Sequence, residues 1–140
     1  YYAKGPWSNY IDRQRGSLLG RYTTTVDGMF EEQSAPQTMG DRQGLRQLTL
    51  SNDGTQMQIA TEGMVAFSLS HFNDAQFNYD VFYGGKHPYD LVRSPQVFAH
   101  FDFWQRGIGN RSCGGDSCLP QYMTPTGAHA FTLRFTPMAK

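Results

Sequence analysis

Apolar and polar side chains alternate in several short segments of the chain, and this alternation is typical of β-strands with one buried face. In the stretch 64–70, Val65, Phe67 and Leu69 would lie on one face of a strand and the residues between them on the other. The same pattern predicts strands over residues 21–26, 46–50, 56–60, 97–104 and 128–135.

Turn signals separate these segments. Asp53-Gly54, between two alternating stretches, predicts a hairpin. Only residues 73–82 resemble a helical turn or two, with Asn73 and Asp74 as caps. Short strands joined by Gly, Pro and Asn/Asp turns predict an all-β fold, an antiparallel β-sandwich with one short helical segment. At 140 residues, we expect a single domain over 1–140.

Composition supports this prediction and excludes some partners. Fifteen glycines, seven prolines and 14% aromatic residues against 17% charged residues favour a turn-rich β domain. Twelve Lys+Arg balance twelve Asp+Glu, so the basic excess that nucleic acid requires is absent, and no apolar run is long enough to span a membrane. We therefore expect neither partner. The chain opens on Tyr1 rather than Met, which suggests a fragment, and the compartment stays open between cytoplasm and periplasm.

Two irregular stretches, 31–45 and 105–126, are long enough to be binding loops or disordered segments. The second begins with Gly107-Ile108-Gly109, but neither a dinucleotide fingerprint nor a following helix supports a phosphate loop. It also holds Cys113 and Cys118, which are either free or bridged to each other. Two thiols without a further Cys or His pair do not complete a metal site, so no cofactor is expected in this chain.

Candidate catalytic groups are sparse. The four histidines, at positions 71, 87, 100 and 129, lack the spacing of metal ligands. No facing pair of carboxylates is evident, so we predict no catalytic residue. Asp12, Arg13 and Arg15, and likewise Asp41, Arg42 and Arg46, are expected to form structural salt bridges.

Aromatic residues are the positive signal, because many lie in or beside glycine- and proline-rich segments. Their rings would stack on the apolar face of a sugar, or else pack in the core or at an interface. The residues concerned are Tyr1, Tyr2, Trp7, Tyr10, Phe98, Trp104 and Tyr122.

Several segments, taken in order, resemble the motifs of one known protein family. Residues 2–13 are similar to that family's Tyr-Gly-x-Gly-Pro-x-Glu-Asn-Tyr-x-Asp-Arg, and residues 36–40 to its Pro-Gln-Glu-Asn-Gly. Residues 67–72 resemble its Phe-Ser-x-Ser-x-Tyr strand. The segments 87–91, 102–113 and 119–122 follow in the family's order, so the resemblance covers nearly the whole chain. The family that these motifs resemble is the small-chain domain of family-two glycoside hydrolase β-galactosidases.

The resemblance implies a C-terminal β-supersandwich similar to galactose mutarotase, of which this chain would be the last half or so. The family's catalytic glutamates, and the divalent and monovalent cations it uses, lie in another domain, so none is carried over and the chain alone is not expected to hydrolyse anything. The implied partners are the remainder of the β-galactosidase polypeptide, galactoside sugars and a second copy through self-association.

The resemblance also implies a loop near the sugar, immediately after Gly-x-Gly. It assigns substrate binding to Asn110, Arg111, Ser112 and Cys113. Some family members carry Asp-Ser-Trp there, and a thiol does not replace an indole face. The chain departs from the family twice more, with Ser8 in place of Glu and Thr38-Met39 in place of Glu-Asn. Besides an enzyme part, a stand-alone carbohydrate-binding or interaction module and a purely structural role remain open.

Overall fold

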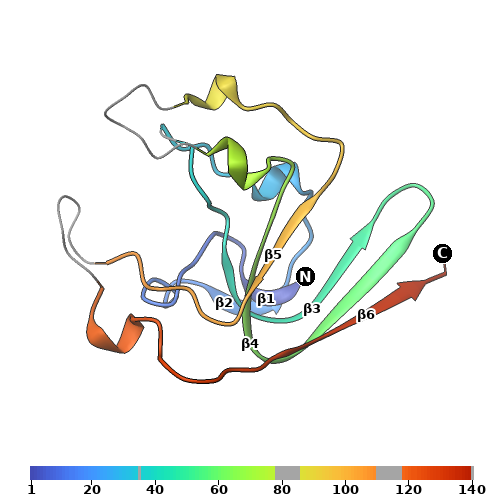
Figure 1. The fold of residues 1–140 in the computed structure, drawn as a ribbon. Helices are drawn as coiled ribbons and strands as arrows, with labels where there is room; N and C mark the ends of the chain where they lie inside the picture. The colour runs from blue at the N-terminus through green and yellow to red at the C-terminus, as the bar shows by residue number, and fades with distance from the viewer. Residues whose placement is uncertain (35, 78–85, 110–117, 140) are drawn as a thin grey trace. The chain divides into compact units, whose positions relative to one another are not determined.

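A computed structural model describes residues 1–34, 36–77, 86–109 and 118–139. Over these residues the chain forms strands and short 3₁₀ turns and no α-helix, which confirms the predicted all-β antiparallel class (Figure 1). The strands are β1 (Tyr2–Gly5), β2 (Leu18–Arg21), β3 (Arg42–Ser51), β4 (Gln56–Ser70), β5 (Phe98–Asp102) and β6 (Thr132–Met138). The 3₁₀ turns are η1 (Asp27–Met29), η2 (Asp74–Gln76), η3 (Pro88–Asp90) and η4 (Pro120–Tyr122).

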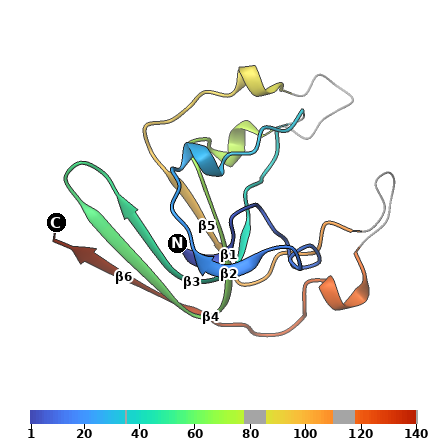
Figure 2. The ribbon, with the colours of Figure 1, turned by 180° about the vertical axis from the view of Figure 1, so that it is seen from behind.

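The strands form one sheet in the order β2-β1-β3-β4-β5, and β6 pairs with β4 beside this path. The first half of β4 pairs with β6, from Gln56 opposite Met138 to Glu62 opposite Thr132. Figures 1 and 2 show β6 running beside the β3–β4 hairpin in both views. Each pairing for which a register is defined is antiparallel, as hairpins and short connections favour.

The predicted hairpin at Asp53-Gly54 is confirmed. The Asn52 side chain accepts hydrogen bonds from the backbone N–H groups of Gly54 and Thr55, which closes the turn. The predicted strands 56–60 and 64–70 are one continuous strand in the structure. Between them Gly63 has a φ of +101°, and the pairing with β3 shifts there, so a bulge takes up the residues that break the alternation.

Residue contacts divide the chain into two compact units. The first unit comprises Tyr1–Thr23, Asp41–Phe67 and Phe101–Lys140, and the second comprises Thr24–Gly40 and Ser68–His100. In the first unit, Ala3, Leu45, Leu48, Ile59, Val65 and Phe67 are buried. In the second unit, Met29 and Leu69 are buried, and the ring of Phe30 lies 4.8 Å from that of Phe72.

The second half of β4 differs from the predicted alternation, because residues 65–69 are all buried. A strand covered on both faces loses the polar face that an alternating pattern implies. Ala66 and Ser68 fit there because both side chains are small. The alternation of Val65, Phe67 and Leu69 therefore identified the strand and only half of its buried surface.

Other boundaries also differ from the sequence prediction. The strand expected at 21–26 is wrong, because β2 ends at Arg21 and residues 22–26 lie in no strand. β1 had no alternating pattern to predict it. Of the helical turn expected over 73–82, the described part forms only η2, which Asn73 caps by accepting from the Ala75 N–H. The remaining positions of that segment, 78–82, lie outside the described residues.

Candidate functional site

The four predicted sugar-binding residues, Asn110, Arg111, Ser112 and Cys113, lie outside the described residues. The structure does describe the segment that leads into them, Gly107-Ile108-Gly109, and the segment that follows from Cys118. The described part of the candidate site is therefore the base of the loop. All of its parts belong to the first unit.

Asn9 is the centre of the base, and its residue is completely buried. Its side-chain amide donates to the carbonyls of Lys4 at 3.1 Å and Trp7 at 3.0 Å, and its side-chain oxygen accepts from the Gln43 N–H at 3.0 Å. Its own backbone N–H donates to the Asp41 carbonyl at 2.8 Å. One side chain thus joins two segments that are more than thirty residues apart in sequence, with its polar atoms satisfied.

Asp12 joins the same segment to the glycine loop. Its carboxylate accepts from the backbone N–H of Ile108 at 3.2 Å and from that of Gly109 at 2.9 Å. The neighbouring Arg13 donates through Nη2 to the Gly109 carbonyl at 2.6 Å. Asp12 and Arg13 are expected from the sequence to form structural salt bridges, and the described hydrogen bonds of both side chains go to backbone groups.

Two glycines permit this approach. A Cβ on Gly107 would lie 2.6 Å from the Asp12 carboxylate and 3.0 Å from the Cys118 Cβ, so only glycine fits there without a shift. Gly109 has a φ of +94°, in the region that other residues rarely adopt. The Gly-x-Gly pattern therefore reflects close packing and backbone conformation at a turn, as its sequence context indicated.

Asp41 is a buried acid that the sequence reasoning assigned only to salt bridging. Its residue is 3% exposed, one carboxylate oxygen accepts from Gln43 at 2.6 Å, and the other, Oδ1, has no partner among the described residues. Burial raises the pKa of Asp41 to about 7, and the negative charge of Asp102 adds to the rise. The Gln43 hydrogen bond and the positive charge of Arg42 oppose it. Asp41 and Asp102 thus interact electrostatically, a pairing that spacing along the chain does not reveal.

Arg42, next to Asp41, is also buried, at 3% exposure. Its Nε donates to the Pro6 carbonyl at 3.2 Å. This bond is a second link between the segment around residue 41 and the segment that contains Asn9. The positive charge of Arg42 lowers the cost of ionising Asp41 nearby.

The predicted aromatic candidates differ in environment. The Tyr1 ring packs 5.4 Å from both Tyr22 and Phe67, as core rings do. Trp7, between Pro6 and Ser8, is 73% exposed. Of the seven candidates, Trp7 is the exposed one, and the other six are half-buried.

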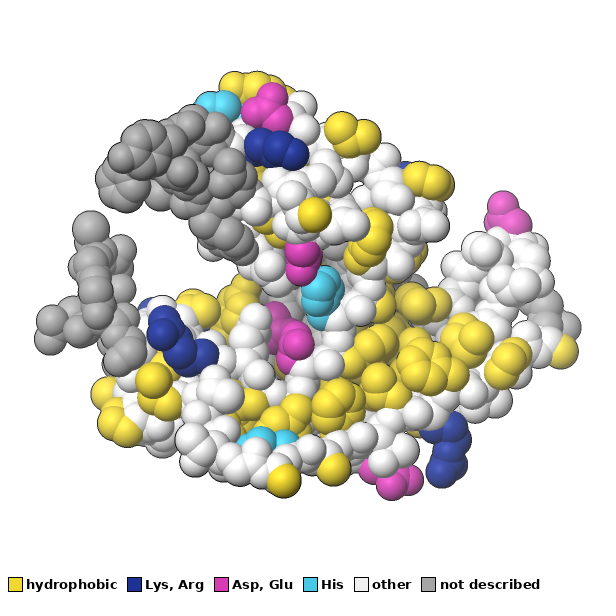
Figure 3. All heavy atoms as spheres, in the orientation of Figure 1, with side chains coloured by type: hydrophobic (Ala, Val, Ile, Leu, Met, Phe, Trp, Pro, Cys, Tyr) yellow, Lys and Arg dark blue, Asp and Glu magenta, His cyan; other side chains and the backbone are white. Residues whose placement is uncertain are grey.

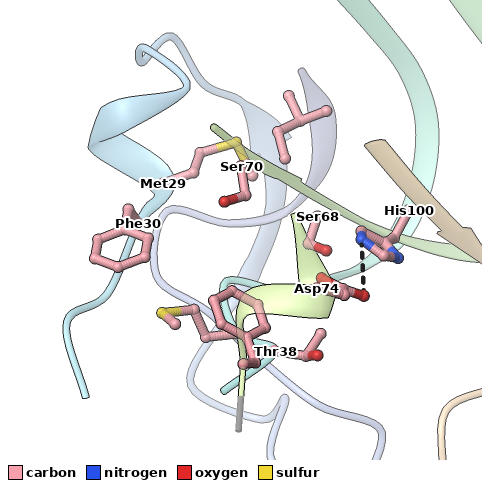
Figure 4. A pocket seen from close by; sticks show the side chains of 10 residues that line it. Met29, Phe30, Thr38, Ser68, Ser70, Asp74 and His100 are labelled. Atoms are coloured by element: carbon pink, nitrogen blue, oxygen red, sulfur yellow. Dashed lines mark ion pairs between the residues drawn. The ribbon is translucent and has the colours of Figure 1, made fainter. Parts of the chain in front are cut away.

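The second unit holds a small cavity of about 10 Å³, which is room for one water molecule and not for a sugar ring. Its lining includes Met29, Phe30, Ser68, Ser70, Asp74 and His100 (Figure 4). His100 Nε2 lies 3.4 Å from an Asp74 carboxylate oxygen, and Figure 4 shows the two side chains facing each other.

The other histidines have structural surroundings. His71 Nδ1 lies 3.0 Å from the carbonyls of Ser94 and Gln96, His87 stacks on Tyr89, and His129 stacks on Phe103. Within the described ranges, no three His, Cys, Asp or Glu side chains are grouped to hold a metal ion. Cys118 is a buried free thiol, and Cys113 lies outside those ranges. No helix in the described part of the chain is long and apolar enough to cross a membrane.

Comparison with known proteins identifies the family. The family model for the β-galactosidase small chain matches residues 1–136. The chain is 28% identical over 136 residues to a β-galactosidase of Vibrio cholerae, covering 96% of this chain and 12% of that protein. It is 30% identical over 126 residues to one of Aeromonas hydrophila, covering 90% and 11%, and 27% identical over 135 residues to one of Streptococcus thermophilus, covering 96% and 13%. The chain thus spans about an eighth of the length of these relatives, and it belongs to the β-galactosidase small-chain family.

Proposed function

We propose that this chain works as part of a β-galactosidase that hydrolyses terminal β-galactosides. Its contribution is scaffold, interface and the loop that begins at Asn110, while the catalytic carboxylates belong to the rest of the polypeptide. Membership of the small-chain family and the match to about an eighth of each β-galactosidase relative support this proposal. The retaining mechanism implied by the resemblance uses two carboxyl groups that flank the glycosidic bond.

One observation carries the proposed role of the loop. Segments that are far apart in sequence meet at the base of the loop. Asn9, in the motif segment 2–13, binds Asp41 and Gln43, which directly follow the motif segment 36–40. Asp12 binds Ile108 and Gly109, which belong to the motif segment 102–113. Binding residues commonly lie on loops that a rigid scaffold positions. A base held by this many hydrogen bonds is suited to present a short segment to a substrate.

The loop's side chains suit sugar hydroxyls. An Asn side chain such as that of Asn110 can donate and accept hydrogen bonds, and an Arg side chain such as that of Arg111 can donate several from a rigid fork. Each such bond adds about 0.5–1.5 kcal/mol net, so the loop refines binding that the catalytic domain provides. This small contribution fits a supporting role better than that of an independent high-affinity sugar site.

We also propose that the rest of the polypeptide covers part of the sheet in the first unit. Every residue of β6 except Leu133 is exposed, and Phe135 is 54% exposed. Figure 3 shows hydrophobic side chains gathered along this strand. The chain is about 12% of its relatives' length, so ample polypeptide exists to cover them. We expect the isolated chain to self-associate in sedimentation velocity runs, and a strictly monomeric particle at high concentration contradicts the proposal.

The loop proposal is tested by steady-state kinetics of the full-length protein on a nitrophenyl galactoside and on lactose. We expect Asn110→Ala and Arg111→Ala each to lower kcat/KM by about 3- to 10-fold. Arg15→Ala, which removes an exposed arginine elsewhere in the chain, is the matched control and leaves kcat/KM unchanged. If both loop variants keep the wild-type values while folded, the loop is structural. If the protein binds galactose through the loop without hydrolysing galactosides, the module is a binding domain.

A further inference from the structure

The turn that carries Asp12 is itself rigidly held. Arg13 donates its backbone N–H to the Tyr10 carbonyl at 2.8 Å, and Tyr10 donates to the Arg13 carbonyl at 3.4 Å. The buried Asn9, directly before this turn, fixes its start through the hydrogen bonds described above. Asp12 therefore projects from a turn whose backbone cannot easily rotate.

Both backbone polar groups of Gly109 are held from this turn. Asp12 accepts from the Gly109 N–H at 2.9 Å, and Arg13 donates to the Gly109 carbonyl at 2.6 Å. That carbonyl belongs to the peptide bond that leads into Asn110. The partners are separated by 96 and 97 residues in sequence, so the contact links distant parts of the chain.

The Gly107 side of the loop is held as well. Gly107 donates its N–H to the Tyr122 carbonyl at 3.0 Å, and it lies directly against the Asp12 carboxylate. With Ile108 bound to the other carboxylate oxygen, each backbone N–H from Gly107 to Gly109 has an acceptor. The three residues before the loop are thus fixed in position and orientation.

We propose that Asp12 and Arg13 are positioning residues for substrate binding in the β-galactosidase. Together they clamp Gly109 and so set the position from which the loop side chains approach the galactoside. This inference rests on the proposed function of the loop. Asp12 and Arg13 do not themselves touch the sugar, and their effect on the reaction passes through Gly109.

The chemistry of the clamp suggests a mild variant. Asp12→Asn keeps the shape of the side chain, but the amide has one accepting oxygen where the carboxylate has two. One of the two N–H groups, on Ile108 or Gly109, then faces an NH₂ group and loses its acceptor. Arg13→Met is a second variant, which keeps much of the length of the side chain and removes the donor to the Gly109 carbonyl.

The test combines hydrogen exchange and kinetics on the full-length protein. In Asp12→Asn, we expect amide exchange in peptides covering residues 107–109 to become about 10-fold faster, because one charge-assisted hydrogen bond is lost. We expect kcat/KM on a nitrophenyl galactoside to fall about 5- to 30-fold in Asp12→Asn and in Arg13→Met. Asp53→Asn and Arg15→Met, which make the same charge changes at exposed positions, leave both readouts unchanged.

A double variant separates positioning from a general structural effect. If Asp12 acts through the loop, Asp12→Asn combined with Arg111→Ala lowers kcat/KM by no more than about twofold beyond the more severe single variant. Unchanged exchange at 107–109 overturns the clamp. Faster exchange with normal kcat/KM, in a protein where Arg111→Ala is impaired, overturns the positioning role while the loop function stands. Loss of kcat/KM in Asp12→Asn with fully active loop variants overturns both the loop function and this inference.

Discussion

Replacing Asp41 by Asn should stabilise the fold, and increasingly so as the pH rises. The pKa of Asp41 is raised from its ordinary value of 3.8 to about 7, mainly by burial. The folded chain therefore holds this proton over a pH range in which the unfolded chain has released it. Stability from this group is fully present below pH 3.8 and is lost as the pH rises to about 7.

The size of the stability gain in Asp41→Asn follows from the rise in the pKa of Asp41. At about 1.4 kcal/mol per pKa unit, the difference between 3.8 and about 7 corresponds to about 4 kcal/mol. Asn reproduces the protonated acid, because its oxygen can accept from Gln43 and its NH₂ takes the place of Oδ1. The advantage of Asp41→Asn should thus be about 2 kcal/mol at pH 5 and about 4 kcal/mol at pH 8.

The assay is urea unfolding followed by circular dichroism at pH 5, 6, 7 and 8, with Asp53→Asn as the matched control. Asp53 is exposed, so Asp53→Asn controls for the loss of one carboxylate outside the core. Between pH 5 and pH 8 the difference for Asp41→Asn should widen by about 2–3 kcal/mol. A difference that stays constant within about 0.5 kcal/mol over this range refutes the argument, because it means that Asp41 is ionised in the folded chain.

Two further changes test packing. Phe67→Ala removes a completely buried ring and should lower the free energy of unfolding by about 3–5 kcal/mol in urea titrations. Phe135 is 54% exposed, so Phe135→Ala should lower it by only about 1 kcal/mol. Equal losses in the two variants contradict the assignment of Phe67 to the core. Gly107→Ala places a Cβ 2.6 Å from the Asp12 carboxylate and should lower the free energy of unfolding by about 1–3 kcal/mol. Gly16→Ala, where a Cβ would have no atom within 4 Å, should be nearly neutral in the same titrations. A neutral Gly107→Ala contradicts the prediction, because it means that the carboxylate moves aside without a loss of stability.

The local pattern of side chains was sufficient to predict much of the sheet. Alternation located β4 and β5, and the Asp53-Gly54 signal located the hairpin, because side-chain direction and turn conformation are set by adjacent residues. β1 escaped prediction because Tyr-Ala-Lys-Gly has no period, and its place depends on pairing with β2 and β3. Strand pairing between distant segments is a tertiary property that no window of sequence contains.

The base of the loop was less predictable than the strands. An acidic residue beside arginines suggested ion pairs, but Asp12 binds backbone N–H groups that lie 96 and 97 residues away. Backbone donors have no signature in a sequence, because every residue except proline carries one. The available signal was the pair of glycines at 107 and 109, which marks a close approach without naming the side chain that approaches.

The same physics explains how the chain can resemble its family at the base of the loop and depart from it in the loop itself. Asn9, Asp12 and Arg13 match the family motif, and each binds backbone atoms, so their contacts do not depend on which side chains follow Gly109. Cys113 departs from the Asp-Ser-Trp of some members, and it lies beyond Gly109 in the sequence. A base held through backbone atoms therefore permits segments of different sequence to follow Gly109 on one scaffold, without rebuilding the sheet.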